Sequence, residues 1–162
     1  MEPKMDIRTA WERYVANVPS DENAINRVAF HLLRRGEAPS ISEVAGILDL
    51  TIKKCQELLE AMSAKGSVTV EEDIVTGAGG LSVIPTSHQI NLKDVRLYCW
   101  CALDAIGIPA ALAEDAEITT VDGFRGDQIH LRFEAGHLIE APPSLYLQLA
   151  PPDQARPLCG GT

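Results

Sequence analysis

Apolar residues recur every three or four positions along the first part of the chain, which is the spacing of amphipathic helices. This pattern predicts one helix over residues 6–17 and a second between Pro19 and Gly36. Ser40 followed by Glu43 has the spacing of a capping box, in which each side chain accepts a hydrogen bond from the other residue's backbone N–H. A short third helix is therefore expected to follow Ser40.

A fourth helix is predicted between Thr51, which suits an N-cap, and Gly66, which suits a helix stop. The period then changes from 3.6 to 2 at residues 68–70, and a glycine-rich turn over residues 77–80 leads into a second apolar run. Three helices followed by a β-hairpin are typical of a winged helix-turn-helix. We therefore expect residues 1–90 to form a winged-helix-like N-terminal domain.

Residues 93–106 are predicted to form a helix that follows the N-cap Asn91 and ends at Gly107, ahead of Pro109. Beyond this helix the period changes to 2 and predicts strands over residues 118–121, 129–133 and 145–149. The sequence therefore predicts an α+β fold, with an N-terminal winged helix-turn-helix followed by a helix packed on a small, mainly antiparallel β-sheet. The second domain is expected to span residues 91–162.

The composition is that of a globular protein with a formal net charge of −9. An acidic chain is poorly suited to a broad nucleic-acid surface, so no nucleic-acid partner is expected. No apolar run is long enough to span a membrane, and the N-terminus lacks the apolar segment of a secretion signal. The cysteines show neither a paired zinc pattern nor a disulfide framework, which favours a cytoplasmic protein with reduced thiols.

Cys101 and Asp104 place a thiol and a carboxylic acid three residues apart within an apolar segment. On the predicted helix this spacing puts both side chains on one face. Burial disfavours a charged carboxylate, so the pKa of Asp104 is expected to be raised, which lets the acid hold a proton near neutral pH. A soft thiolate beside a proton donor suits chemistry on a soft metal. From spacing alone, the competing interpretations are a structural buried cysteine and an acid that caps a loop or pairs with an arginine.

The segments Ile41–Asp49 and Arg96–Asp104, with Pro109 and Ala110, resemble the alkylmercury lyases, also called organomercurial lyases. The motif Trp-Cys-Ala-Leu-Asp at residues 100–104 is the specific part of this resemblance. The similarity runs roughly from residue 20 to residue 159 and is thin after Ile118. The resemblance implies cleavage of a carbon–mercury bond by protonolysis, which releases a hydrocarbon and Hg(II).

In that family the cysteine of the motif and the acid three residues later are catalytic, which gives these roles to Cys101 and Asp104. A second catalytic cysteine follows several strands, and the matching position here is Cys159. The resemblance thus implies that the thiolates of Cys101 and Cys159 bind mercury and that Asp104 delivers the proton. It further implies an organomercurial substrate, no cofactor, an excess of small-molecule thiol for product release, and mercuric reductase or cellular thiols as acceptors of Hg(II).

The chain departs from the family pattern in two places. Residues 120–124 lack a further cysteine that many members carry, and we interpret that cysteine as structural. The chain ends at Thr162, shortly after Cys159, whereas family members continue well past their second catalytic cysteine. A C-terminally reduced member of the family is therefore expected.

The remaining thiols are expected to be structural. On a helix, Cys99 would point about 200° away from Cys101, so both could not face one mercury atom, and Cys99 is expected to pack in the core. Cys55 lies on the apolar stripe of the fourth helix. The four histidines show no ligand spacing to one another, so a zinc site is not favoured.

Two other functions stay open. A winged helix could read DNA through the helix that carries Lys53 and Lys54, although the acidic chain opposes phosphate contacts. A non-catalytic relative could instead carry a soft ion such as Hg(II) or Cu(I) on Cys101 with Cys99 or Cys159. Turnover distinguishes these functions, because a carrier leaves the carbon–metal bond intact.

Overall fold

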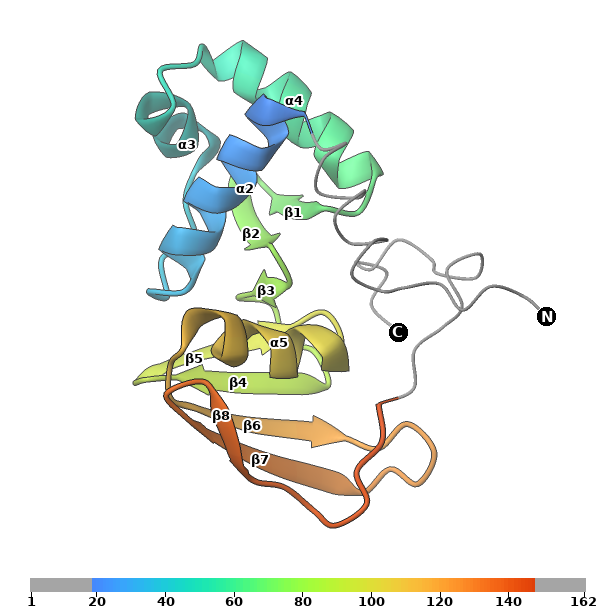
Figure 1. The fold of residues 1–162 in the computed structure, drawn as a ribbon. Coiled ribbons are helices and arrows are strands. Elements are labelled where there is room, and N and C mark those ends of the chain that lie inside the picture. Colours follow the sequence, from blue (N-terminus) through green and yellow to red (C-terminus); the bar gives the residue numbers. More distant parts are fainter. Residues whose placement is uncertain (1–18, 148–162) are drawn as a thin grey trace, which may run out of the picture.

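The computed structural model describes residues 19–147, with three helices at one end of the molecule and a fourth lying on a sheet at the other end (Figure 1). The helices are α2 (Ser20–Leu33), α3 (Ile41–Ile47), α4 (Ile52–Ala64) and α5 (Ala102–Leu112). The strands are β1 (Val68–Glu71), β2 (Ile74–Ala78), β3 (Leu81–Ser82), β4 (His88–Leu92), β5 (Val95–Cys99), β6 (Ala116–Val121), β7 (Gln128–Glu134) and β8 (His137–Glu140). The helix predicted over residues 6–17 lies outside the described residues. None of the helices within residues 19–147 is long and apolar enough to cross a membrane.

Helices α2, α3 and α4 confirm three of the predicted helices. Ser40 Oγ accepts a hydrogen bond from the Glu43 backbone N–H at 3.2 Å, and the Glu43 carboxylate accepts one from the Ser40 backbone N–H at 2.7 Å, so the capping box is present. Thr51 caps α4 by accepting a hydrogen bond from the Lys54 backbone N–H at 3.2 Å. The apolar faces of these helices, with β1 and β2, enclose one core, which includes Ile25, Leu33, Val44, Cys55, Leu59, Met62 and Val75.

The strands that follow α4 form a different hairpin from the predicted one. β1 and β2 are joined by Glu72 and Asp73, whose φ angles of 47° and 66° are those of a type I′ turn. Because this turn contains no glycine, asparagine or proline, the sequence gives little signal for it. The glycine-rich segment instead joins β2 to β3. Three helices followed by a hairpin are therefore present, and the winged helix-turn-helix assignment stays a prediction.

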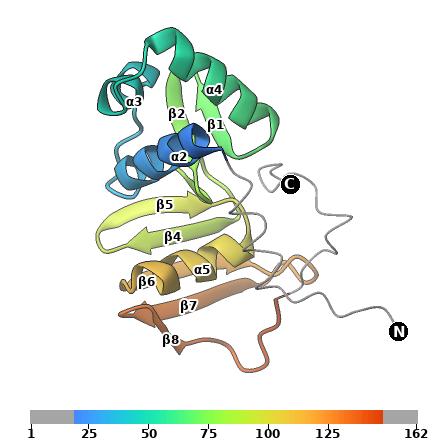
Figure 2. The same cartoon turned by 45° about the horizontal axis from the view of Figure 1, so that its top comes forward.

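The eight strands of the described residues form one antiparallel sheet in the order β1-β2-β3-β5-β4-β6-β7-β8, which is larger than the small sheet predicted (Figures 1 and 2). β6 and β7 confirm two predicted strands. The strand predicted over residues 145–149 is wrong in its described part, because residues 141–147 form no strand. The last strand within residues 19–147 is β8, which follows a turn at Ala135 and Gly136. The described residues therefore combine helices with an antiparallel sheet, as the predicted α+β fold does.

The helix predicted over residues 93–106 is wrong in its first half. Residues 95–99 form β5, which pairs with β3 on one side and with β4 on the other. Its valine, leucine and tyrosine suit a strand, and periodicity alone does not distinguish a short apolar run of this kind from a helix. The predicted N-cap Asn91 consequently lies within β4. The correction moves Cys101 from the middle of a helix to its beginning.

Helix α5 also ends later than predicted, because it continues past Gly107 and Pro109 to Leu112. Both residues are poor helix formers, but Pro109 is fully buried and Ile108 is nearly so. The apolar face of α5 therefore packs on the sheet over β4, β5 and β6, and the burial outweighs the local preference (Figure 2). This second core also contains Leu81, Ile90, Leu97, Cys99, Ile118, Leu131 and Phe133.

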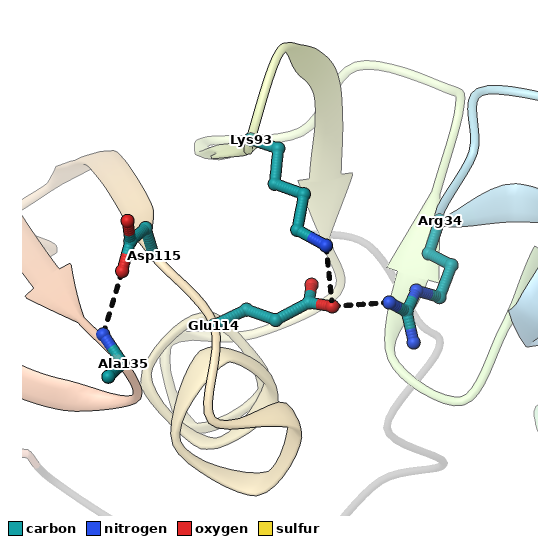
Figure 3. Close-up of polar contacts among 5 residues, drawn as sticks. All are labelled: Arg34, Lys93, Glu114, Asp115 and Ala135. Atoms are coloured by element: carbon teal, nitrogen blue, oxygen red, sulfur yellow. Dashed lines mark hydrogen bonds and ion pairs between the residues drawn. The ribbon is translucent and has the colours of Figure 1, made fainter.

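An ionic network at the end of α5 ties this helix to the helical end of the molecule (Figure 3). Glu114 forms an ion pair with Arg34, which follows α2, and its Oε1 lies 3.2 Å from Lys93 Nζ in the β4–β5 turn. Next to it, Asp115 accepts a hydrogen bond from the Ala135 backbone N–H at 2.7 Å. The Glu114 side chain is only 14% exposed, so this network is partly shielded from water. It fixes the helix whose other end carries Cys101.

Candidate active site

Cys101 and Asp104 meet at the N-terminus of α5. Cys101 is the N-cap residue, and its backbone is extended with φ −147° and ψ 170°. Its Sγ accepts a hydrogen bond from the Asp104 backbone N–H at 3.5 Å and donates one to Asp104 Oδ2 at 3.1 Å. The structure therefore brings the two predicted residues into contact, as an N-cap residue and the third helical residue rather than as neighbours on one helical face.

Burial favours the protonated forms of both groups. Desolvation raises the pKa of Asp104 above its ordinary value of 3.8, although the hydrogen bonds from Cys101 and the charge of His88 act in the opposite direction. Desolvation also raises the pKa of the Cys101 thiol to about 11, with the Asp104 backbone N–H lowering it in part. The Asp104 carboxyl therefore binds a proton more readily than an aspartate in water does. It also contacts the Cys101 thiol, which must give up its own proton before it can bind a metal.

Gly80 provides the space in which the Asp104 carboxyl sits. A Cβ atom at this position would lie 2.6 Å from both Cγ and Oδ1 of Asp104, closer than real Cβ contacts. The φ angle of Gly80 is +88°, a conformation that other residues rarely adopt. Its carbonyl accepts a hydrogen bond from the Trp100 backbone N–H at 3.0 Å, which continues the β3–β5 ladder up to the residue before Cys101. Both space and backbone conformation therefore require glycine here.

A histidine that the sequence analysis does not assign to the site lies near the pair. His88 begins β4 directly opposite Cys99 of β5, and its Nδ1 forms a hydrogen bond with Thr120 Oγ1 on β6. Burial lowers the pKa of His88, while the charge of Asp104 acts to raise it, so the two groups interact electrostatically. The alternation of His88, Ile90 and Leu92, the last two buried, is the sequence signal that could have placed the histidine on the inner face of the sheet.

The other predicted thiols have different surroundings. Cys99 is fully buried, which confirms that it packs in the core, although it does so from a strand and not from a helix. Cys55 is fully buried in the core of the three helices. Cys159 lies outside the described residues, so its role stays a prediction. Within residues 19–147 no group of three or more histidine, cysteine and acidic side chains could hold a metal ion.

Two hollows on the surface of the described part lie elsewhere. One of about 530 Å³ is lined by charged residues of the β4–β5 turn, β6 and β7, and one of about 420 Å³ lies between α2 and α3. Neither is lined by Cys101 or Asp104. The thiol–acid pair therefore lies outside both of these hollows.

Known proteins are similar to this chain in sequence. Residues 81–158, which include the Cys101–Asp104 pair, match the sequence model of the family described as MerB, alkylmercury lyase. The alkylmercury lyases of Bacillus cereus and Clostridium butyricum are each 30% identical over 118 residues, covering 73% of this chain and 53% of the relative. The alkylmercury lyase of Staphylococcus epidermidis is 23% identical over 129 residues, covering 79% and 58%. The chain thus spans little more than half the length of these curated relatives.

A solved structure agrees with the fold as a whole. The crystal structure described as the mercury-bound form of MerB2 matches with a TM-score of 0.76 and 27% sequence identity, over 83% of this chain and 66% of that chain. The match places this chain in a class of proteins that combine helices with an antiparallel sheet. In this chain a thiol–acid pair lies at the N-terminus of α5. The chain belongs to the alkylmercury lyase family.

Proposed function

We propose that this protein cleaves the carbon–mercury bond of organomercurials by protonolysis, with Cys101 binding mercury and Asp104 delivering the proton. The observation that supports this proposal is the 3.1 Å contact between Cys101 Sγ and Asp104 Oδ2, within the segment that matches the family. It joins a soft ligand for mercury and an acid that can hold the proton for the carbon, and the reaction needs both.

The first step is capture of the substrate. Cys101 must lose its proton to bind R–Hg⁺, and the Asp104 carboxylate at 3.1 Å is positioned to accept it. The step converts R–Hg–X, the thiol and the carboxylate into R–Hg–S bound at Cys101, a protonated Asp104 and X⁻. The Asp104 backbone N–H and the positive end of the α5 dipole stabilise the developing thiolate.

The second step breaks the carbon–mercury bond. The proton on Asp104 is transferred to the carbon, which takes the electron pair of the breaking bond and leaves as a hydrocarbon, while Hg(II) stays on sulfur. A second thiolate on mercury pushes electron density toward this carbon and makes it easier to protonate, and Cys159 is the proposed source. Desolvation of Asp104 suits this step, because it favours the protonated acid from which the transfer starts.

The remaining features of the proposal follow from this chemistry. The reaction needs no cofactor, and small-molecule thiols release Hg(II) by exchanging with the protein thiolates. Cellular thiols or mercuric reductase in the cytoplasm are the proposed acceptors. We assign the helical end, as a winged helix-turn-helix, a supporting role rather than DNA binding, because the chain is acidic and the ionic network ties α2 to α5.

Anaerobic incubation of the reduced protein with phenylmercuric acetate and excess thiol tests the proposal, with benzene followed by gas chromatography. We expect benzene over many turnovers, and its loss in Cys101→Ser and Asp104→Asn. Cys55→Ser is the matched control, because it removes a buried thiol from the other core and is expected to keep activity. Stoichiometric mercury uptake without benzene would contradict the proposal and indicate a soft-metal carrier.

A further inference from the structure

We propose that Cys99 is an additional mercury ligand, which holds Hg(II) together with Cys101 after the organic group has left. The proposal rests on the proposed function for the arrival of mercury at Cys101. Its mercury-binding part, however, can be tested with inorganic Hg(II) and without turnover.

The fold brings the start of α5 over the face of the sheet that buries Cys99. β5 ends at Cys99, and a bend at Trp100 and Cys101 turns the chain into α5. α5 packs back onto β4 and β5, and its buried residues share one core with Cys99. The predicted helix through both cysteines, which would turn Cys99 about 200° away from Cys101, is therefore absent.

The surroundings of Cys99 connect it to the site. It is fully buried between Leu81 of β3 and His88 of β4, directly opposite both in the sheet. Asp104, which contacts Cys101, lies against Gly80, and the residue after Gly80, Leu81, is the one directly opposite Cys99. Cys99 is a free thiol, so no disulfide has to be reduced before its sulfur binds mercury.

The chemistry of the product suits this buried position. An isolated thiolate at Cys99 would be costly in an apolar core, but Hg(II) bound by two thiolates carries no net charge. The Cys99 thiol would replace the second thiolate on the mercury at Cys101 and give a Cys101–S–Hg–S–Cys99 bridge. Thus the Cys99 S–H bond and one Hg–S bond break, one Hg–S bond forms at Cys99, and the departing thiolate takes the proton. Two small-molecule thiols would then remove mercury and return both protein thiols to their protonated forms.

The test uses the full chain with Cys55 and Cys159 both changed to alanine, so that Cys99 and Cys101 are the remaining thiols. The protein is titrated with mercuric chloride in competition with dithiothreitol, and mercury X-ray absorption counts the sulfur neighbours. We expect one Hg(II) per chain with two protein sulfurs. Adding Cys99→Ala should lower the affinity more than about tenfold, since loss of even an outer partner of a metal ligand costs this much. Unchanged affinity and sulfur count would overturn the proposal.

A second pair of measurements separates this inference from the proposed function. Circular dichroism and thermal unfolding must show that the Cys99→Ala chain is folded, and Cys99→Ser, which keeps the size of the side chain, should show the same loss of affinity. If the unmodified protein forms benzene and Cys99→Ala does not weaken Hg(II) binding, only the role of Cys99 is wrong. If Hg(II) bridges the two thiols and no benzene forms, the mercury site stands and the proposed function is wrong.

Discussion

Gly80→Ala is predicted to slow the reaction strongly by moving Asp104. The new Cβ would lie 2.6 Å from Asp104 Cγ, and the carboxyl must retreat by about 0.8 Å to reach the 3.4 Å at which ordinary contact begins. This shift disrupts the 3.1 Å contact with Cys101 Sγ. A misplacement of about 1 Å at a reacting group costs about 100-fold in rate. We therefore expect benzene formation from phenylmercuric acetate to fall by about this factor.

Gly126→Ala is the matched control for the backbone strain at Gly80. Gly126 has a φ angle of +74°, and a Cβ atom there would meet no atom within 4 Å. Both substitutions cost about 1–2 kcal/mol of backbone strain, which for a chain of this size lowers the melting temperature by about 2–8 °C. The control should therefore be destabilised and fully active. If Gly80→Ala is as active as Gly126→Ala, catalysis does not depend on the position that Gly80 gives to the Asp104 carboxyl, and the prediction is wrong.

Three further outcomes are expected. Glu114→Gln should lower the free energy of unfolding by about 1.5–3 kcal/mol, because it removes charged hydrogen bonds from a shielded site. Lys93→Ala should lower it by less than about 1 kcal/mol, because the Lys93 side chain is 66% exposed. Equal losses in chemical denaturation would contradict the network in Figure 3. The raised pKa of Asp104 means that its charged form destabilises the folded state as the pH rises above the ordinary value of 3.8. Asp104→Asn should therefore gain stability relative to the unmodified protein between pH 4 and pH 8, and a difference that does not change with pH in thermal unfolding would refute this. Thr120→Val removes the hydrogen bond to His88 Nδ1, so the His88 ring resonances in NMR should shift, and unchanged resonances would show that the contact is absent in solution.

The helices that the sequence predicts best are those whose caps are side chains. Ser40 with Glu43 and Thr51 begin their helices through local hydrogen bonds, so neighbouring residues suffice to find them. The β1–β2 hairpin has no such local signal, because Glu72 and Asp73 form a turn that usually contains glycine or asparagine. β5 is missed because a short apolar run fits both a strand and a helix, and its pairing with β3 and β4 decides between them.

The candidate site shows the same division. The roles of Cys101 and Asp104 are predicted from the family motif that contains them. Their spacing alone is also that of Ser40 and Glu43, so it fits a helix cap equally well. Gly80 and His88 reach the pair only through strand pairing, which a single sequence does not specify. The thiol–acid pair could therefore be predicted from the sequence. Gly80 and His88 could not, because their positions depend on how the strands pair.

Intact-protein mass spectrometry after addition of one equivalent of phenylmercuric acetate tests the central claim most directly. The claim is that Cys101 captures the organomercurial and that Asp104 protonates its carbon. The unmodified protein should carry mercury without the phenyl group, Asp104→Asn should retain the intact phenylmercury adduct, and Cys101→Ser should lose the adduct at this site. If Asp104→Asn also carries mercury without phenyl, the proton comes from another group and the proposed role of Asp104 is wrong.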